Sequence, residues 1–197
     1  MLVPMVLVNE GNVERSYDIY SRLLKDRIIM ISGEVNETMA SVVVSELLYL
    51  QSEDPDAPIH MYINSPGGSV VDGLAIVDTM NLISCPVFTY CVGQCASMGS
   101  IFLVSGEKGH RYALPNSRIM IHQVSGGSQG TYEDMKRSIN EAGRLNELLT
   151  GILANGTSKS LEYVKKDMDR DYFMGANEAL EYGIVDKVIS SVSDRFN

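Results

Sequence analysis

Short apolar runs alternate along this chain with longer segments in which apolar residues recur at every third or fourth position. The short runs predict buried strands at residues 27–33, 59–64, 87–92, 111–114, 118–122 and 184–189. The wider spacing predicts helices at residues 16–25, 37–53, 70–80, 98–104, 132–153, 161–168 and 178–182. Because strands and helices alternate, we expect an α/β fold with a mostly parallel sheet.

Capping residues and loops set the limits of these elements. Asn36 is a predicted N-cap, Asn155-Gly156 a predicted C-cap, and Gly183 a predicted helix stop. Residues 1–15 mix an apolar start with polar residues and glycine, which predicts a mobile or conditionally ordered arm. No repeat or linker divides the chain, so all 197 residues are expected to form one domain.

Composition narrows the range of functions. The formal net charge of −9 argues against nucleic-acid binding, which needs an excess of Lys and Arg. No apolar run approaches the ~18 residues of a membrane span, and the apolar N-terminus lacks the basic flank of a signal peptide. The three cysteines are odd in number and lack metal-site spacing, which predicts reduced thiols and no zinc. We therefore expect a cytoplasmic protein that binds neither nucleic acid nor a membrane.

Three predicted strands end in residues that could take part in catalysis: the glycine pair Gly67-Gly68, then Ser97, then His122. Because the C-terminal ends of parallel strands meet in one crevice, we expect these residues to be neighbours. A serine hydroxyl is a poor nucleophile without an adjacent base, and histidine is the usual base. Of the three histidines, only His122 ends an apolar strand. The alternatives are that Ser97 is a helix N-cap and that His122 is a core residue.

A histidine base needs a third group that fixes its tautomer, normally a carboxylate. Asp167, Asp169 and Asp171 cluster before an aromatic and apolar run, and Asp171 lies nearest to that run, although spacing alone does not separate it from Asp169. The glycine pair could supply one N–H of an oxyanion hole, and the amide of Met98 a second. The alternative for the glycines is an ordinary Pro-Gly turn.

Four motifs together carry a resemblance to a known family. They are Ile63-Asn64-Ser65-Pro66-Gly67-Gly68, Gly93-Gln94-Cys95-Ala96-Ser97-Met98-Gly99, Pro115-Asn116-Ser117-Arg118-Ile119-Met120-Ile121-His122-Gln123 and Asp169-Arg170-Asp171-Tyr172-Phe173-Met174. In this combination and order the chain closely resembles the proteolytic subunits of ATP-dependent Clp proteases, the ClpP family. The resemblance implies a ClpP/crotonase-like β-β-α superhelix. It also implies an N-terminal entrance arm at residues 1–15 and a protruding strand–helix handle at about residues 123–153.

The resemblance further implies a serine endopeptidase that cuts unfolded polypeptides inside a barrel of two stacked heptamers. In that comparison Ser97 is the nucleophile, His122 the general base and Asp171 its orienter, and the amides of Gly68 and Met98 form the oxyanion hole. No metal or small cofactor is implied, since ATP is used by a hexameric partner unfoldase. Asp169 and Arg170 correspond to a contact between the rings. The partner's docking pocket corresponds to Tyr62, Leu82, Tyr90, Tyr112 and Ile189.

Two alternatives come from other functional classes. One is a noncatalytic scaffold subunit of a mixed ring, which the intact Ser97, His122 and Asp171 argue against. The other is a crotonase-type acyl-CoA enzyme, which uses two backbone amides as an oxyanion hole. The same three residues and the absence of a basic nucleotide patch argue against it.

Overall fold

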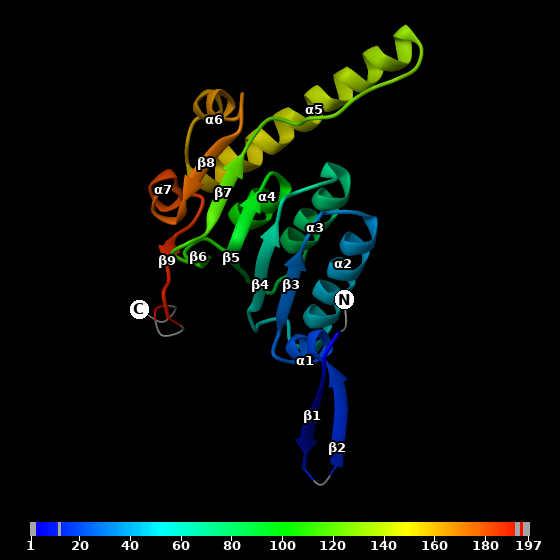
Figure 1. The fold of residues 1–197 in the computed structure, drawn as a ribbon, viewed down its shortest axis with the longest axis vertical. Coiled ribbons are helices and arrows are strands. Elements are labelled where there is room, and N and C mark those ends of the chain that lie inside the picture. Colours follow the sequence, from blue (N-terminus) through cyan, green and yellow to red (C-terminus); the bar gives the residue numbers. More distant parts are fainter. Residues whose placement is uncertain (1–2, 12, 192–193, 195–197) are drawn as a thin grey trace.

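The computed structural model describes residues 3–11, 13–191 and 194 (Figure 1). The strands are β1 (Met5–Glu10), β2 (Val13–Asp18), β3 (Ile28–Ser32), β4 (Ile59–Ser65), β5 (Val87–Ala96), β6 (Arg111–Ala113), β7 (Arg118–Ile121), β8 (Tyr172–Gly175) and β9 (Lys187–Val188). The helices are α1 (Ile19–Lys25), α2 (Glu37–Glu53), α3 (Val70–Leu82), α4 (Met98–Val104), α5 (Tyr132–Thr157), α6 (Leu161–Asp167) and α7 (Ala176–Tyr182).

The main sheet is mostly parallel, as the alternation of strands and helices predicts. Its strand order is β3-β4-β5-β6-β9, and β7 pairs in parallel with the other half of β5. Only β8 is antiparallel to its neighbour, β7. β5 is therefore the central strand, bonded to β4 on one edge and to β6 and then β7 on the other.

A bulge in β5 divides the strand between these two partners. Ile63 pairs with Cys91 and Ser65 with Cys95, so two steps along β4 match four along β5. Gly93 lies inside this bulge at φ 84°, a left-handed conformation that favours glycine. After the bulge, β5 leaves β6 and pairs with β7. The bulge thus aims the end of β5 at the strand that carries His122.

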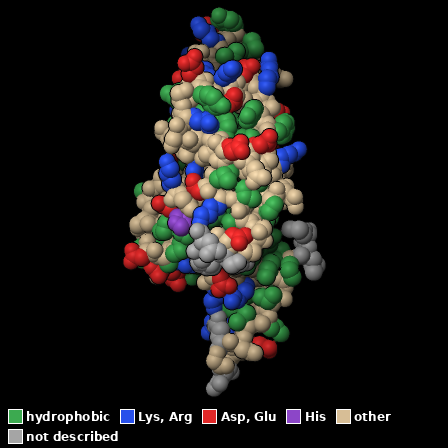
Figure 2. All heavy atoms as spheres, turned by 90° about the vertical axis from the view of Figure 1, so that its left-hand side faces the viewer, with side chains coloured by type: hydrophobic (Ala, Val, Ile, Leu, Met, Phe, Trp, Pro, Cys, Tyr) green, Lys and Arg blue, Asp and Glu red, His purple; other side chains and the backbone are tan. Residues whose placement is uncertain are grey.

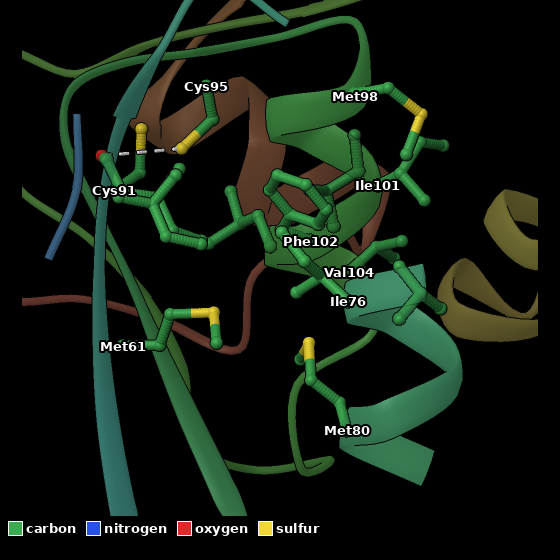
Figure 3. Close-up of a cluster of buried hydrophobic side chains, with 14 of the residues drawn as sticks. Met61, Ile76, Met80, Cys91, Cys95, Met98, Ile101, Phe102 and Val104 are labelled. Carbon is green, nitrogen blue, oxygen red and sulfur yellow. Dashed lines mark hydrogen bonds between the residues drawn. The ribbon is translucent and has the colours of Figure 1, made fainter. Parts of the chain in front are cut away.

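The hydrophobic core lies between the sheet and the helices α3 and α4 (Figure 3). Phe102 on α4 and Ile76 on α3 are both 0% exposed, against Met61 on β4. Burying a side chain of this size stabilises a fold by about 1.5–3 kcal/mol. All three cysteines are buried free thiols, as the sequence predicts. Cys91 and Cys95 lie in this core, which makes them packing residues.

Helix ends follow the sequence signals in part. Asn36 caps α2 as predicted, with its side chain accepting from the N–H of Met39 at 3.0 Å. The prediction of a C-cap at Asn155-Gly156 is wrong, because α5 continues to Thr157 and ends on the left-handed Ser158. The glycine serves close packing instead: a Cβ at Gly156 would lie 2.5 Å from the Cγ2 of Val104.

Two segments project from opposite ends of the body (Figure 1). The predicted arm forms a β1–β2 hairpin where it is described, while residues 1, 2 and 12 lie outside the described residues. β2 extends to Asp18, which caps α1, so that helix begins later than residue 16. The N-terminal half of α5 projects at the other end beside residues 122–130, which form no strand within this chain. Of the helices described, none is long and apolar enough to cross a membrane.

Candidate active site

Ser97 lies at the tight turn between β5 and α4. Its backbone has φ 53° and ψ −121°, and its N–H donates to the carbonyl of Met120 on β7 at 2.9 Å. A non-glycine residue held at positive φ costs on the order of 1–3 kcal/mol, which the surrounding structure must offset. Ser97 occupies the N-cap position, but its side chain accepts no hydrogen bond from the helix. Ser97 is therefore the N-cap of α4 by position alone, and its hydroxyl is directed elsewhere.

The hydroxyl of Ser97 faces His122, which in turn faces Asp171. The Oγ of Ser97 lies 2.9 Å from Nε2 of His122, and Nδ1 of His122 lies 3.0 Å from Oδ1 of Asp171. In this arrangement Nδ1–H donates to the carboxylate, which leaves Nε2 free to accept the serine proton. The residues come from the ends of β5 and β7 and from the start of β8.

The structure also separates the candidates that the sequence leaves open. Asp167 accepts a hydrogen bond from the hydroxyl of Tyr182 at 3.0 Å, and Asp169 contacts Arg170 at 3.8 Å, so Asp171 is the carboxylate that meets the histidine. The other two histidines bond tyrosine hydroxyls on the opposite face of the sheet, through Nδ1 in both cases. His122 itself is partly exposed, because its side chain keeps 21% of its accessible surface.

The glycine pair forms a loop that closely approaches Ser97. Gly67 has φ 94°, and a Cβ there would lie 2.5 Å from the Cβ of Ser97. Gly68 has φ 148°, and a Cβ there would lie 2.3 Å from the carbonyl oxygen of Val35. Both positions therefore require glycine, which an ordinary Pro-Gly turn does not explain.

Hydrogen bonds hold this loop and leave two N–H groups available. Val35 bonds the carbonyl of Gly67 and the N–H of Ser69, so the N–H of Gly68 points to the other side. Met98 is the first residue of α4, where N–H groups lack partners within the helix and the helix dipole is positive. Across the described residues, neither N–H appears among the bonds that hold these turns. Two N–H groups left available near a serine hydroxyl are the kind of donor that an oxyanion hole requires.

Ser65 supports the loop, and sequence reasoning assigned it no role. Its hydroxyl donates to the carbonyl of Gly33 at 2.7 Å and accepts from the N–H of Gly67 at 3.1 Å. The residue is 0% exposed. Its place in the motif beside the glycine pair was the available signal.

A narrow cavity of about 40 Å³ opens beside Ser97 and His122. Apolar side chains form much of its wall: Val70, Ile101, Ile121, Val124, Leu149, Leu153 and Met168. Leu149 and Leu153 come from the C-terminal half of α5. From the sequence these two are recognisable only as apolar helix positions, because the cavity depends on how α5 packs on α4.

Residues 10–192 match the family model described as Clp protease. This chain belongs to the Clp protease family. The match covers most of the chain, and the parallel α/β architecture agrees with the ClpP/crotonase fold. Ser97, His122, Asp171 and the glycine pair all lie within the matched residues.

The five predicted docking positions of this Clp protease family chain do not all come together. Tyr90, Tyr112 and Ile189 form a buried cluster, with Tyr62 packed against it. The rings of Tyr62 and Tyr90 stack at 4.4 Å, and those of Tyr90 and Tyr112 at 4.9 Å. Leu82, at the end of α3, lies outside this cluster and is 77% exposed.

The predicted ring-contact residues are open to solvent in the single chain. The side chains of Arg170 and Asp169 keep 88% and 72% of their accessible surface. They lie between the end of α6 and Asp171. No group of three or more His, Cys, Asp or Glu side chains among the described residues could hold a metal ion.

Proposed function

We propose that this Clp protease family chain is a serine endopeptidase with Ser97 as nucleophile, His122 as general base and Asp171 as the orienting carboxylate. The observation that carries the proposal is the continuous relay from Ser97 Oγ to His122 at 2.9 Å and from His122 to Asp171 at 3.0 Å. Each contact lies within the range that proton transfer and tautomer control require.

The geometry supports a two-step acyl transfer. Ser97 Oγ attacks the substrate carbonyl carbon while its proton moves to Nε2 of His122. The carboxylate of Asp171 stabilises the imidazolium that forms, and the imidazolium then protonates the leaving amine. A water molecule, activated by the same histidine, hydrolyses the acyl-enzyme. The N–H groups of Gly68 and Met98 bind the oxyanion, where one such donor is worth about 10²–10³ in rate.

The apolar cavity supports a preference for substrates with an apolar side chain next to the cleaved bond. Seven apolar side chains line it, together with Ser97 and His122. Burying an apolar side chain there gives binding energy next to the reacting carbonyl. An unfolded polypeptide can present a single side chain to so narrow a cavity, and we propose this class of substrate.

We also propose assembly into two stacked heptamers, served by a hexameric ATP-dependent unfoldase. Family membership supports the Clp ATPase partner, and exposed apolar residues on α5 support assembly. Tyr132 and Ile139 are 70% and 67% exposed. Figure 2 shows hydrophobic side chains among charged ones in the upper part of the molecule, where α5 projects. The exposure of Asp169 and Arg170 leaves them available for a contact between rings.

The partner's loops would bind at the tyrosine cluster. In the family such loops enter pockets between adjacent subunits, so Leu82 of one copy would face the tyrosines of the next. This placement accounts for the exposure of Leu82 within a single chain. The tyrosine rings offer apolar faces with polar hydroxyls, a composition suited to a reversible interface.

A paired serine substitution tests the catalytic assignment. Ser97→Ala should abolish hydrolysis of a fluorogenic peptide, whereas Ser52→Ala, at an exposed serine of α2, should leave it unchanged. Full activity in Ser97→Ala would contradict the assignment. Wild-type protein without peptidase activity would instead support the noncatalytic scaffold.

A further inference from the structure

His122 and Asp171 form the next pair of the β7–β8 ladder beyond its last rung. The antiparallel register pairs Arg118 with Gly175 and ends with Ile121 opposite Tyr172. One further step along both strands places His122 opposite Asp171. A pair at the end of a ladder frays more readily than one inside it, because it has neighbours on one side only.

The side of this pair that faces away from the ladder is open. The side chain of Asp171 keeps 58% of its accessible surface. A hollow of about 520 Å³ lies beside it, and the charged residues in its wall are Asp169, Arg170 and Asp171. Apolar packing therefore contributes little to holding this carboxylate, and its position depends on hydrogen bonds.

Gln123 supplies hydrogen bonds on that open side. Its backbone N–H donates to the carbonyl of Met168 at 2.6 Å, and its side-chain Nε2 donates to the carbonyl of Asp169 at 2.7 Å. The first bond joins the segment that follows His122 to the end of α6. The second reaches the residue two positions before Asp171. The catalytic pair is thereby enclosed between the ladder and the two bonds of Gln123.

We propose that Gln123 is a positioning residue whose side chain holds the segment of Asp171 against His122. The inference rests on the proposed peptidase function. The backbone bond of Gln123 is available to any residue except proline, but the bond to Asp169 needs a side-chain donor of this length. Since a displacement of about 1 Å can reduce catalysis about 10²-fold, a partial loosening of Asp171 should be measurable.

The test is a double-substitution cycle read by the rate at which a fluorophosphonate labels each active site. Gln123→Met keeps the length of the side chain and removes the donor. It should slow labelling about tenfold while the final fraction of labelled protein stays complete. In an Asp171→Ala background the same substitution should have no further effect, because Gln123 acts through Asp171. The same tenfold loss in both backgrounds, or none in either, would overturn the proposal.

Two further variants separate positioning from folding and assembly. Gln123→Lys keeps an N–H donor and should label at close to the wild-type rate, and labelling as slow as in Gln123→Met would contradict the proposal. Gln129→Met, at an exposed glutamine of the same segment, is the matched control and should label normally. Native mass spectrometry should give wild-type and Gln123→Met assemblies of the same size, and a smaller assembly would make Gln123 an assembly residue instead. Absence of labelling in the wild-type protein would refute the proposed function itself.

Discussion

The two halves of β5 differ in regularity although they belong to one strand. The first half pairs with β4 and β6 in even register and carries the stacked Tyr90 on the face away from the core. The second half follows the bulge at Gly93, pairs with β7 and ends at the strained Ser97. The regular half forms a rigid, buried support. The irregular half places Ser97 where the strand ends, so the proposed active site and the proposed docking site occupy different ends and faces of one sheet.

The largest expected effect is a loss of peptide hydrolysis from substitutions at the site that the irregular half of β5 supports. His122→Ala should reduce peptide hydrolysis by about 10⁶-fold, and Asp171→Asn by about 10⁴-fold, because the asparagine stabilises the wrong histidine tautomer. Steady-state kinetics measures both losses. Thermal unfolding should be little changed, since the site lies at the edge of the core. A variant that lost activity by unfolding would show a lowered melting temperature and would not support the triad.

The next effect is a loss of unfolding free energy at the ion pair between Arg111 and Asp186. Arg111 of β6 is 3% exposed, and its guanidinium donates two hydrogen bonds to the carboxylate of Asp186, at 2.8 and 2.6 Å. Asp186→Asn would leave a buried guanidinium without its charged partner, which costs about 3–5 kcal/mol of unfolding free energy. Urea unfolding at neutral pH measures this loss.

The same pair gives a pH dependence of defined sign. Burial raises the pKa of Asp186, but the hydrogen bonds and charge of Arg111 outweigh it and hold the pKa below its ordinary value of 3.8. A lowered pKa in the folded state stabilises the fold above the unfolded pKa and ceases to do so as pH falls through the folded value. The difference between wild type and Asp186→Asn should therefore shrink below about pH 3.8. An equal difference at neutral and acidic pH would contradict this account.

A third effect tests whether the regular half has a function of its own. Tyr62 is half-buried and stacks on Tyr90 at 4.4 Å. Tyr62→Ala should weaken unfoldase binding by about 2 kcal/mol, as loss of a central aromatic anchor does, and should suppress ATP-dependent degradation of a folded substrate. Cleavage of short peptides should persist. Equal loss of both activities would indicate a folding defect and remove the support for docking.

The smallest expected effect comes from the bulge at Gly93, which separates the two halves of β5. Gly93 and Gly109 have similar φ values of 84° and 92°, but only at Gly93 would a Cβ meet a neighbour, Asn64 Oδ1 at 3.0 Å. Both alanine variants should lose about 1 kcal/mol of stability from backbone strain. Only Gly93→Ala should also lower kcat, by about tenfold, because the bulge directs Ser97. Similar kcat values in both variants would show that the bulge does not control the site.

Local patterns predict the elements well and the residues of the candidate active site in part. Ser97 and His122 could be selected because each ends an apolar strand. Asp171 could not be separated from Asp169, since that choice depends on the antiparallel β7–β8 register. This register joins segments about fifty residues apart in the chain, and no local sequence pattern predicts such a pairing. Gln123 was missed for the same reason, because a polar residue in a loop is ordinary until its acceptors are known.

The projecting segments were predicted less well than the core. The β1–β2 hairpin pairs only with itself, so Met5, Leu7 and Val13 stay exposed, and the sequence predicts only an arm. The C-terminal end of α5 was misplaced because Gly156 was taken as a stop, whereas it allows close contact with Val104. Leu82 shows a further limit: its exposure becomes meaningful only if a second copy of the chain covers it.

The central claim is that Ser97 is a nucleophile activated by His122. Its most direct test is to treat the purified protein with a fluorophosphonate and to locate the adduct by peptide mapping with mass spectrometry. The account predicts one adduct per chain, on Ser97, and a labelling rate that falls strongly in His122→Ala. An adduct on another serine, or labelling of Ser97 at the same rate without His122, would contradict it.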